Sequence, residues 1–170
     1  AAAADDIHEA MLCPVGDLVG QRQQFAMIAH QGAEQLGQLF ERRFGGLRRL
    51  YGFEGAQRIF DGHAIVVGIG GVGSWVAEAF ARSGVGRITL IDLDMVAESN
   101  VNRQVHALDN AFGKAKTTAM AERILAINPD CQVTEIEDFV THDNLEALLG
   151  RSFDFVVDAI DQVRIKTAMI

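Results

Sequence analysis

A glycine-rich turn between an apolar segment and a helix-like pattern constrains this chain more than any other feature. Residues 65–67 are apolar and lead into Gly68-Ile-Gly-Gly-Val-Gly73, which has the spacing Gly-x-Gly-x-x-Gly. Glycine at Gly68 allows a tight turn, at Gly70 lets backbone N–H groups approach an anion, and at Gly73 lets the helix pack against the strand. The turn therefore predicts a strand–turn–helix unit that binds phosphate at the helix N-terminus.

An acidic residue follows the next predicted strand. Asp92 comes directly after the apolar segment 88–91 and is followed by Leu93 and Asp94. A carboxylate at this position can accept hydrogen bonds from ribose hydroxyls. Together, the turn and the acid predict a nucleotide site, but they do not decide between a dinucleotide and ATP.

Strand-like and helix-like segments alternate after residue 62. We predict strands at 63–68, 87–92, 132–137 and 153–158, and helices at 72–83, 114–127, 142–149 and from 162 onward. Strand–helix–strand order predicts a parallel sheet with right-handed crossovers. The nearly continuous apolar strands predict helices on both faces of the sheet. We therefore expect an α/β fold with a Rossmann-like parallel sheet and an N-terminal helical extension.

The part of the chain before the sheet has a different pattern. Residues 1–20 are predicted to be a mobile tail, and residues 21–61 an N-terminal helical segment that Phe44-Gly45-Gly46 interrupts. Residues 62–170 are expected to form the nucleotide-binding domain. This domain stops in mid-pattern, so we expect the natural protein to continue beyond it.

Composition narrows the class of protein. The 170 residues are 49% hydrophobic, enough for the core of one domain, and the net charge of −8 disfavours a general nucleic-acid coat protein. No run of about 18 apolar residues occurs, so we expect no membrane span and a cytoplasmic protein. Cys13 and Cys131 lack C-x-x-C spacing, which argues against a zinc site. We expect Cys131 to be a buried, inert thiol.

Arginines gather in one short stretch before the sheet. They are Arg42, Arg43, Arg48, Arg49 and Arg58. This cluster is either a solvated helix face or an element that faces an anion, such as ATP or RNA.

Further polar residues lie at the carboxyl ends of predicted strands or on the loops that leave them. The loop 98–104 contains Arg103, Gly113-Lys114-Ala115-Lys116 opens the third predicted helix, and the last strand ends in Asp158-Ala-Ile-Asp161. Ligands of open parallel sheets bind at this edge. Cations there would neutralise a triphosphate, and a carboxylate would hold Mg²⁺. This set favours ATP, because a hydride-transfer site needs no such cations.

These motifs resemble the adenylation domain of ubiquitin-activating-type enzymes, which include the molybdopterin and thiamine sulfur-carrier adenylyltransferases. The shared motifs are Gly68-x-Gly-Gly-x-Gly-Ser74, Asp92-x-Asp94, Ser99-Asn-x-Asn-Arg-Gln104, Lys116 and the Asp158/Asp161 strand end. Other short motifs are similar to those of the tRNA threonylcarbamoyladenosine dehydratases within that group. They are Arg43-Phe-Gly-Gly46, Arg49-Leu-Tyr-Gly52, Asn102-Arg-Gln-Val-His-Ala-Leu108 and Asp138-Phe-Val-Thr141.

The resemblance, which runs from about residue 42 to residue 170, implies roles for individual residues. The implied nucleotide-binding residues are Gly68, Gly70, Gly71, Gly73, Asp92, Asp94, Asn100, Asn102, Arg103 and Lys116. Arg103 and Lys116 would stabilise charge at the α-phosphate, and Asp161 would hold Mg²⁺. Arg43, or alternatively Arg42, would reach the ATP site of a partner subunit.

Several residues have a structural interpretation beside the functional one. We expect Trp75 to fill the helix–sheet core, His106 to be structural and Lys114 to lie on the helix surface. Asp94 is either a site residue or the cap of a turn. Asp158 is either a second metal ligand or a hydrogen-bond acceptor at the strand end.

The function implied by the resemblance is activation of a carboxylate with ATP and Mg²⁺. The substrate would be a threonylcarbamoyl-modified tRNA, and the partners a second copy of the chain and a sulfur-transfer protein. One alternative is a sulfur-carrier adenylyltransferase, which two C-x-x-C pairs beyond residue 170 would favour. The other is an NAD-dependent oxidoreductase, for which Asp92 has a role but Arg103 and Lys116 have none.

Overall fold

The computed structural model of this chain describes residues 40–150 and 152–169. The chain divides into two units, Ala1–Arg42 and Arg43–Ile170, and nearly all described residues belong to the second. The predicted tail, the predicted helical segment up to residue 39 and Cys13 lie outside the described residues.

Four parallel strands form one sheet. They are β1 (His63–Val67), β2 (Arg87–Ile91), β3 (Gln132–Ile136) and β4 (Phe155–Asp158). The order is β3-β2-β1-β4, so β1 pairs with β2 on one side and with β4 on the other. The predicted Rossmann-like parallel sheet is confirmed, although each strand is one or two residues shorter than its predicted range.

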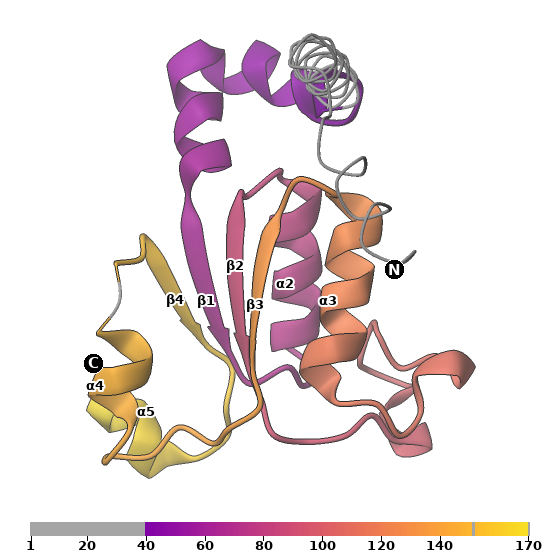
Figure 1. Cartoon of the computed structure of the whole chain (residues 1–170), viewed down its shortest axis with the longest axis vertical. Coiled ribbons are helices and arrows are strands. Elements are labelled where there is room, and N and C mark those ends of the chain that lie inside the picture. The colour runs from indigo at the N-terminus through magenta and orange to yellow at the C-terminus, as the bar shows by residue number, and fades with distance from the viewer. Residues whose placement is uncertain (1–39, 151, 170) are drawn as a thin grey trace, which may run out of the picture. The chain divides into compact units, whose positions relative to one another are not determined.

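Helices cover both faces of this sheet (Figure 1). The helices are α2 (Gly73–Arg82), α3 (Lys116–Ile127), α4 (Leu145–Leu149) and α5 (Val163–Met169). Alternate β1 residues point to opposite faces: Val66 packs in a cluster with Met120 of α3, whereas Ile65 packs with Ile165 of α5. Both clusters are buried, which is why β1 is apolar at consecutive positions.

Residues 43–61 are helical, and the interruption predicted at Phe44-Gly45-Gly46 is wrong. Phe44 is buried, and a Cβ added at Gly84 would lie 3.2 Å from its ring and 3.0 Å from that of Phe60. Burial of the aromatic ring outweighs the low helix propensity of two glycines. Within this helical stretch only Gly52 has a left-handed φ, of 72°, which glycine tolerates.

Candidate nucleotide-binding site

The carboxyl end of β1 is the point where the chain connections of the sheet diverge. From β1 the chain runs through α2 to β2 on one side, while β4 returns to the other side of β1. Gly68 follows β1 directly, and its backbone N–H donates to the carbonyl of Ile91 at 2.8 Å. Ligands of doubly wound folds bind at such switch points.

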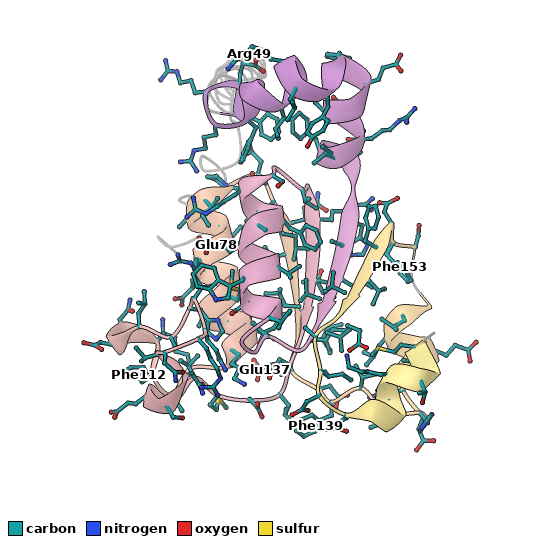
Figure 2. The ribbon with its side chains drawn as sticks, turned by 180° about the vertical axis from the view of Figure 1, so that it is seen from behind. Arg49, Glu78, Phe112, Glu137, Phe139 and Phe153 are labelled. Carbon is teal, nitrogen blue, oxygen red and sulfur yellow. The ribbon has the colours of Figure 1, made fainter. Side chains whose placement is uncertain are left out.

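A cavity of about 520 Å³ opens at this point, between the ends of the four strands. The described residues that line it include Gly68, Gly70, Gly71, Asp92, Asp94, Arg103, Gln104, Lys116, Asp138, Phe139, Asp161 and Gln162. Figure 2 shows Phe139 at this carboxyl end of the sheet and Phe153 toward the opposite end. The volume lies within the range of small-molecule sites.

The three glycines of the turn have different physical roles. Gly68 has a φ of 87°, so the chain turns there in a conformation that other residues rarely adopt. A Cβ added at Gly73 would lie 1.8 Å from the carbonyl oxygen of Gly68, which leaves no space for a side chain where α2 meets the turn. A Cβ at Gly70 would meet no atom within 4 Å. Gly70 therefore leaves its backbone open to a ligand, whereas Gly73 serves packing and is not among the described lining residues.

Asp92 braces the turn. One carboxylate oxygen accepts the backbone N–H of Ile69 at 2.6 Å, and the other accepts that of Asp94 at 2.8 Å. Each oxygen has a second lone pair, so the same carboxylate is able to accept a ribose hydroxyl. The side chain thus combines a structural role with its predicted one.

Lys116 is held in the cavity by Asp94. Its Nζ lies 2.7 Å from Oδ2 of Asp94, and its backbone N–H donates to the Asp94 carbonyl at 2.9 Å. The Lys116 side chain is 8% exposed and that of Asp94 60% exposed, so the pair presents its anionic half to solvent. Lys114 lies just before α3, and not on the helix as expected, and forms an ion pair with Glu122 of α3 at 2.8 Å.

Arg103 is held by hydrogen bonds at both its guanidinium and its backbone carbonyl. Its guanidinium donates to the carbonyl of Ser99 at 2.8 Å and to Oδ1 of Asn102 at 2.9 Å. Its own carbonyl accepts the indole N–H of Trp75 at 3.0 Å. Trp75 is 55% exposed, so the expectation that it fills the helix–sheet core is wrong.

Besides Gly73, three predicted site residues are not among the described residues that line the cavity. Asn100 is buried, and its Oδ1 accepts the backbone N–H of Ala97 at 3.0 Å. Asn102 contacts Arg103 as described above. Arg43 donates to the carbonyls of Ala126, at 3.2 Å, and Ile127, which places its charge at the C-terminus of α3.

His106 and Cys131 lie in the interior and not in the cavity lining. Burial, followed by the positive charges of Lys116 and Arg123, lowers the pKa of His106 to about 4. Burial raises the pKa of the Cys131 thiol to about 11. At neutral pH the imidazole is therefore neutral and the thiol protonated, as expected of structural residues.

The cavity contains carboxylates suited to Mg²⁺. Asp161 is exposed and lines it, whereas Asp158 forms an ion pair with Lys166 at 2.8 Å and accepts the backbone N–H of Ile160. Among the described residues no three acidic, histidine or cysteine side chains form a metal cluster. Because Mg²⁺ usually takes one or two carboxylates together with phosphate oxygens, this donor set fits a metal that enters with a nucleotide.

The site also contains residues that motif reasoning did not assign. Gln104, Asp138 and Phe139 line the cavity, and Gln104 is 5% exposed with no hydrogen-bond partner for its Oε1 among the described atoms. The rule that ligands bind outside the carboxyl ends of parallel strands identifies Asp138 and Phe139, since they follow β3. Gln104 carries no such signal apart from its place beside Arg103.

The residues that line this cavity all lie in a part of the chain that matches a known protein family. A model described as the ThiF family matches residues 43–169. The chain belongs to the ThiF family. The resemblance to ubiquitin-activating-type adenylation domains is thereby confirmed.

Relatives of this ThiF-family chain include tRNA threonylcarbamoyladenosine dehydratases. The Escherichia coli K12 enzyme is 55% identical over 131 residues, which cover 77% of this chain and 49% of that protein. The molybdopterin-synthase adenylyltransferase of the same organism is 31% identical over 121 residues, covering 71% and 48%. A crystal structure of the E. coli dehydratase TcdA in complex with ATP has a TM-score of 0.76 at 55% identity, covering 78% of this chain and 54% of that one.

This ThiF-family chain spans about half the length of the curated relatives it matches. Within residues 40–150 and 152–169, no helix combines the length and apolar character needed to cross a bilayer.

Proposed function

We propose that the protein containing this chain is an ATP-dependent tRNA threonylcarbamoyladenosine dehydratase. The observation that carries the proposal is that Arg103 and Lys116 line the same cavity as the glycine turn. Two cations beside a phosphate-binding turn suit a triphosphate. The 55% identity to the E. coli dehydratase, and the ATP in the TcdA complex, support the same activity.

The first step we propose is adenylation of the threonyl carboxylate. A carboxylate oxygen attacks the α-phosphorus of ATP, the bond from that phosphorus to the bridging oxygen breaks, and pyrophosphate leaves with the electron pair. Backbone N–H groups of Gly70 and Gly71 and the N-terminus of α2 would orient the phosphates. Arg103 and Lys116 would neutralise the charge that accumulates in the transition state.

The second step closes a ring. A nitrogen of the threonylcarbamoyl group attacks the activated carbonyl carbon and loses its proton, and the carbon–oxygen bond to AMP breaks. The sum is loss of one water from the modified nucleoside, with ATP converted to AMP and pyrophosphate. Arg103 and Lys116 would also stabilise AMP as a leaving group, because they lie on the phosphate side of the cavity.

Mg²⁺ and a second subunit belong to the same proposal. Asp161 would hold Mg²⁺, which when bound would neutralise phosphate oxygens of ATP. A homodimer would bring Arg43 of one subunit to the cavity of the other, and a sulfur-transfer protein remains a further predicted partner. The exposed Arg49 and Arg58 of the helical residues 43–61 offer positive charge for tRNA on a chain of net charge −8.

A sulfur-carrier adenylyltransferase is the second candidate, because it would use the same cavity for the C-terminus of a carrier protein. The 31% identity to the molybdopterin-synthase adenylyltransferase gives it weaker support than the 55% identity gives the dehydratase. Both candidates use ATP, and the ATP complex of TcdA argues against a nicotinamide-dependent oxidoreductase.

The test uses the full-length protein with Mg²⁺ and ATP. We expect AMP release that depends on tRNA carrying threonylcarbamoyladenosine, and a product nucleoside lighter by one water in mass spectrometry. Arg103→Ala should lower this turnover about 100-fold or more. Turnover with a carrier protein and none with the modified tRNA would favour the second candidate, and binding of NAD without ATP would refute both.

A further inference from the structure

Two consecutive residues at the start of α2 hold the loop that carries Arg103. The indole N–H of Trp75 donates to the Arg103 carbonyl at 3.0 Å, and Oγ of Ser74 accepts the backbone N–H of Val105 at 3.4 Å. The two contacts fall on either side of Gln104, which faces the cavity. The start of α2 therefore holds the loop by hydrogen bonds on both sides of Gln104.

The same part of α2 is continuous with the phosphate-binding turn. The backbone N–H of Ser74 donates to the carbonyl of Gly70 at 3.1 Å, and Ser74 is fully buried. A Cβ added at Gly71 would lie 3.5 Å from Cγ and Cδ of Arg103, so the arginine stem lies in contact distance of the turn. Turn, helix start and arginine loop thus form one connected unit.

Trp75 contributes to this unit without being part of the hydrophobic core. Its side chain is 55% exposed, and it joins segments 28 residues apart in the sequence. An exposed indole adds little apolar burial to stability. Its hydrogen bond instead joins the Arg103 backbone to the start of α2, beside the glycine turn.

We infer that Trp75 is a positioning residue, which holds Arg103 at the distance from the glycine turn that the phosphates of a bound nucleotide require. The inference rests on the proposed ATP-dependent function. Misplacing a charged group by about 1 Å strongly weakens its interaction with a ligand. The loss of the Trp75 hydrogen bond, although it lies outside the cavity lining, should therefore weaken the interaction of Arg103 with the phosphates.

The test compares ATP and AMP binding by calorimetry in full-length wild-type protein and the W75F variant, which keeps an aromatic ring but removes the N–H donor together with part of the indole. We expect W75F to bind both ATP and AMP about 5- to 10-fold more weakly, the usual effect of one lost hydrogen bond, because the two nucleotides share the α-phosphate at which Arg103 would act. Phe153→Leu, an exposed aromatic toward the other end of the sheet, is the matched control and should change neither affinity.

A double-mutant cycle separates positioning from general destabilisation. If Trp75 acts through Arg103, W75F should have no further effect on ATP affinity in an Arg103→Ala background, whereas independent effects would add. Thermal melting sets the temperature range in which every variant is folded, and binding is measured within it. Equal ATP affinity of W75F and wild type, or an additive cycle, overturns this inference alone. Failure of the wild type to bind ATP overturns it together with the proposed function.

Discussion

The carboxylate of Asp92 accepts the backbone N–H of Ile69, with the nitrogen 2.6 Å from Oδ2. Ile69 belongs to the glycine turn after β1, and Asp92 follows the last residue of β2. One side chain therefore joins the ends of two neighbouring strands at the mouth of the cavity. The residue predicted to hold ribose also fixes the shape of the turn that would hold the phosphates.

Asp92→Ala should therefore impair both folding and nucleotide binding. Two backbone N–H groups lose their acceptor, so we expect a loss of about 1–3 kcal/mol in the free energy of unfolding. ATP affinity should fall by more than about 10-fold, because a ribose acceptor is lost as well. Urea denaturation and calorimetry measure the two effects. Asp92→Asn keeps one acceptor oxygen, so its stability and ATP affinity should lie between those of the wild type and the alanine variant. An alanine variant of unchanged stability would contradict the role of Asp92 in holding the turn.

Lys116→Met should reduce activity far more than stability. The lysine lies on the cavity, and its partner Asp94 is 60% exposed and stays hydrated when the ammonium is removed. We expect ATP–pyrophosphate exchange to fall about 100-fold with a small change in melting temperature. Lys114→Met, two residues before the start of α3 and outside the cavity lining, is the matched control. Equal losses in the two variants would show that Lys116 has no special role.

Arg43 contacts the C-terminus of α3, and one mixing experiment tests whether it also has the proposed role at a partner's cavity. Its contacts with the α3 carbonyls predict that Arg43→Ala costs up to about 1 kcal/mol of stability. If Arg43 also completes the partner's cavity, then mixing inactive Arg43→Ala and Arg103→Ala proteins should restore activity, because mixed dimers contain one intact site. Subunit exchange without recovery of activity would leave Arg43 with the helix-capping role only.

Glu78 links α2 to α3 and should make stability depend on pH (Figure 2). It is buried, and hydrogen bonds from Arg123 and then Arg82 hold its pKa below the ordinary 4.5. A lowered folded-state pKa gives stability that is present above 4.5 and is lost as the pH falls through the folded value. We expect Glu78→Gln to cost about 2 kcal/mol at pH 7 in urea denaturation. The difference from wild type should shrink below about pH 4, and a constant difference would contradict the linkage.

Cys131 should be unreactive in the folded protein. Its side chain is 5% exposed and its thiol pKa is raised to about 11, so almost no thiolate is present at neutral pH. In a Cys13→Ser background, a disulfide reagent should label Cys131 only at the rate of unfolding. Rapid labelling under native conditions would show that the thiol is accessible.

The phosphate-binding end of the fold could be predicted because backbone geometry dictates it. Gly68 has a left-handed φ, and Gly73 has no space for a Cβ, so these residue types are required whatever surrounds them. Asp92 and Asp161 could be placed in the cavity because the ends of parallel strands meet at one edge of a sheet.

The remaining features depend on contacts between distant segments. Trp75 is expected in the helix–sheet core, but it is 55% exposed and donates a hydrogen bond to the distant Arg103. Phe44 sits beside two glycines that predict a break, and its burial near Gly84 keeps the helix intact. Local propensity does not contain such tertiary information.

The position of β4 beside β1 has a consequence for synthesis on the ribosome. β1, β2 and β3 lie between residues 63 and 136, so they are able to pair while the chain is still growing. Ala159 and Gln162, which also line the cavity, follow β4, the C-terminal strand of the four described. A nascent chain of this sequence acquires its glycine turn early but its closed binding pocket only after that strand has left the exit tunnel. ATP added to stalled ribosomes should accordingly protect long nascent chains from protease and leave chains that end before β4 unprotected.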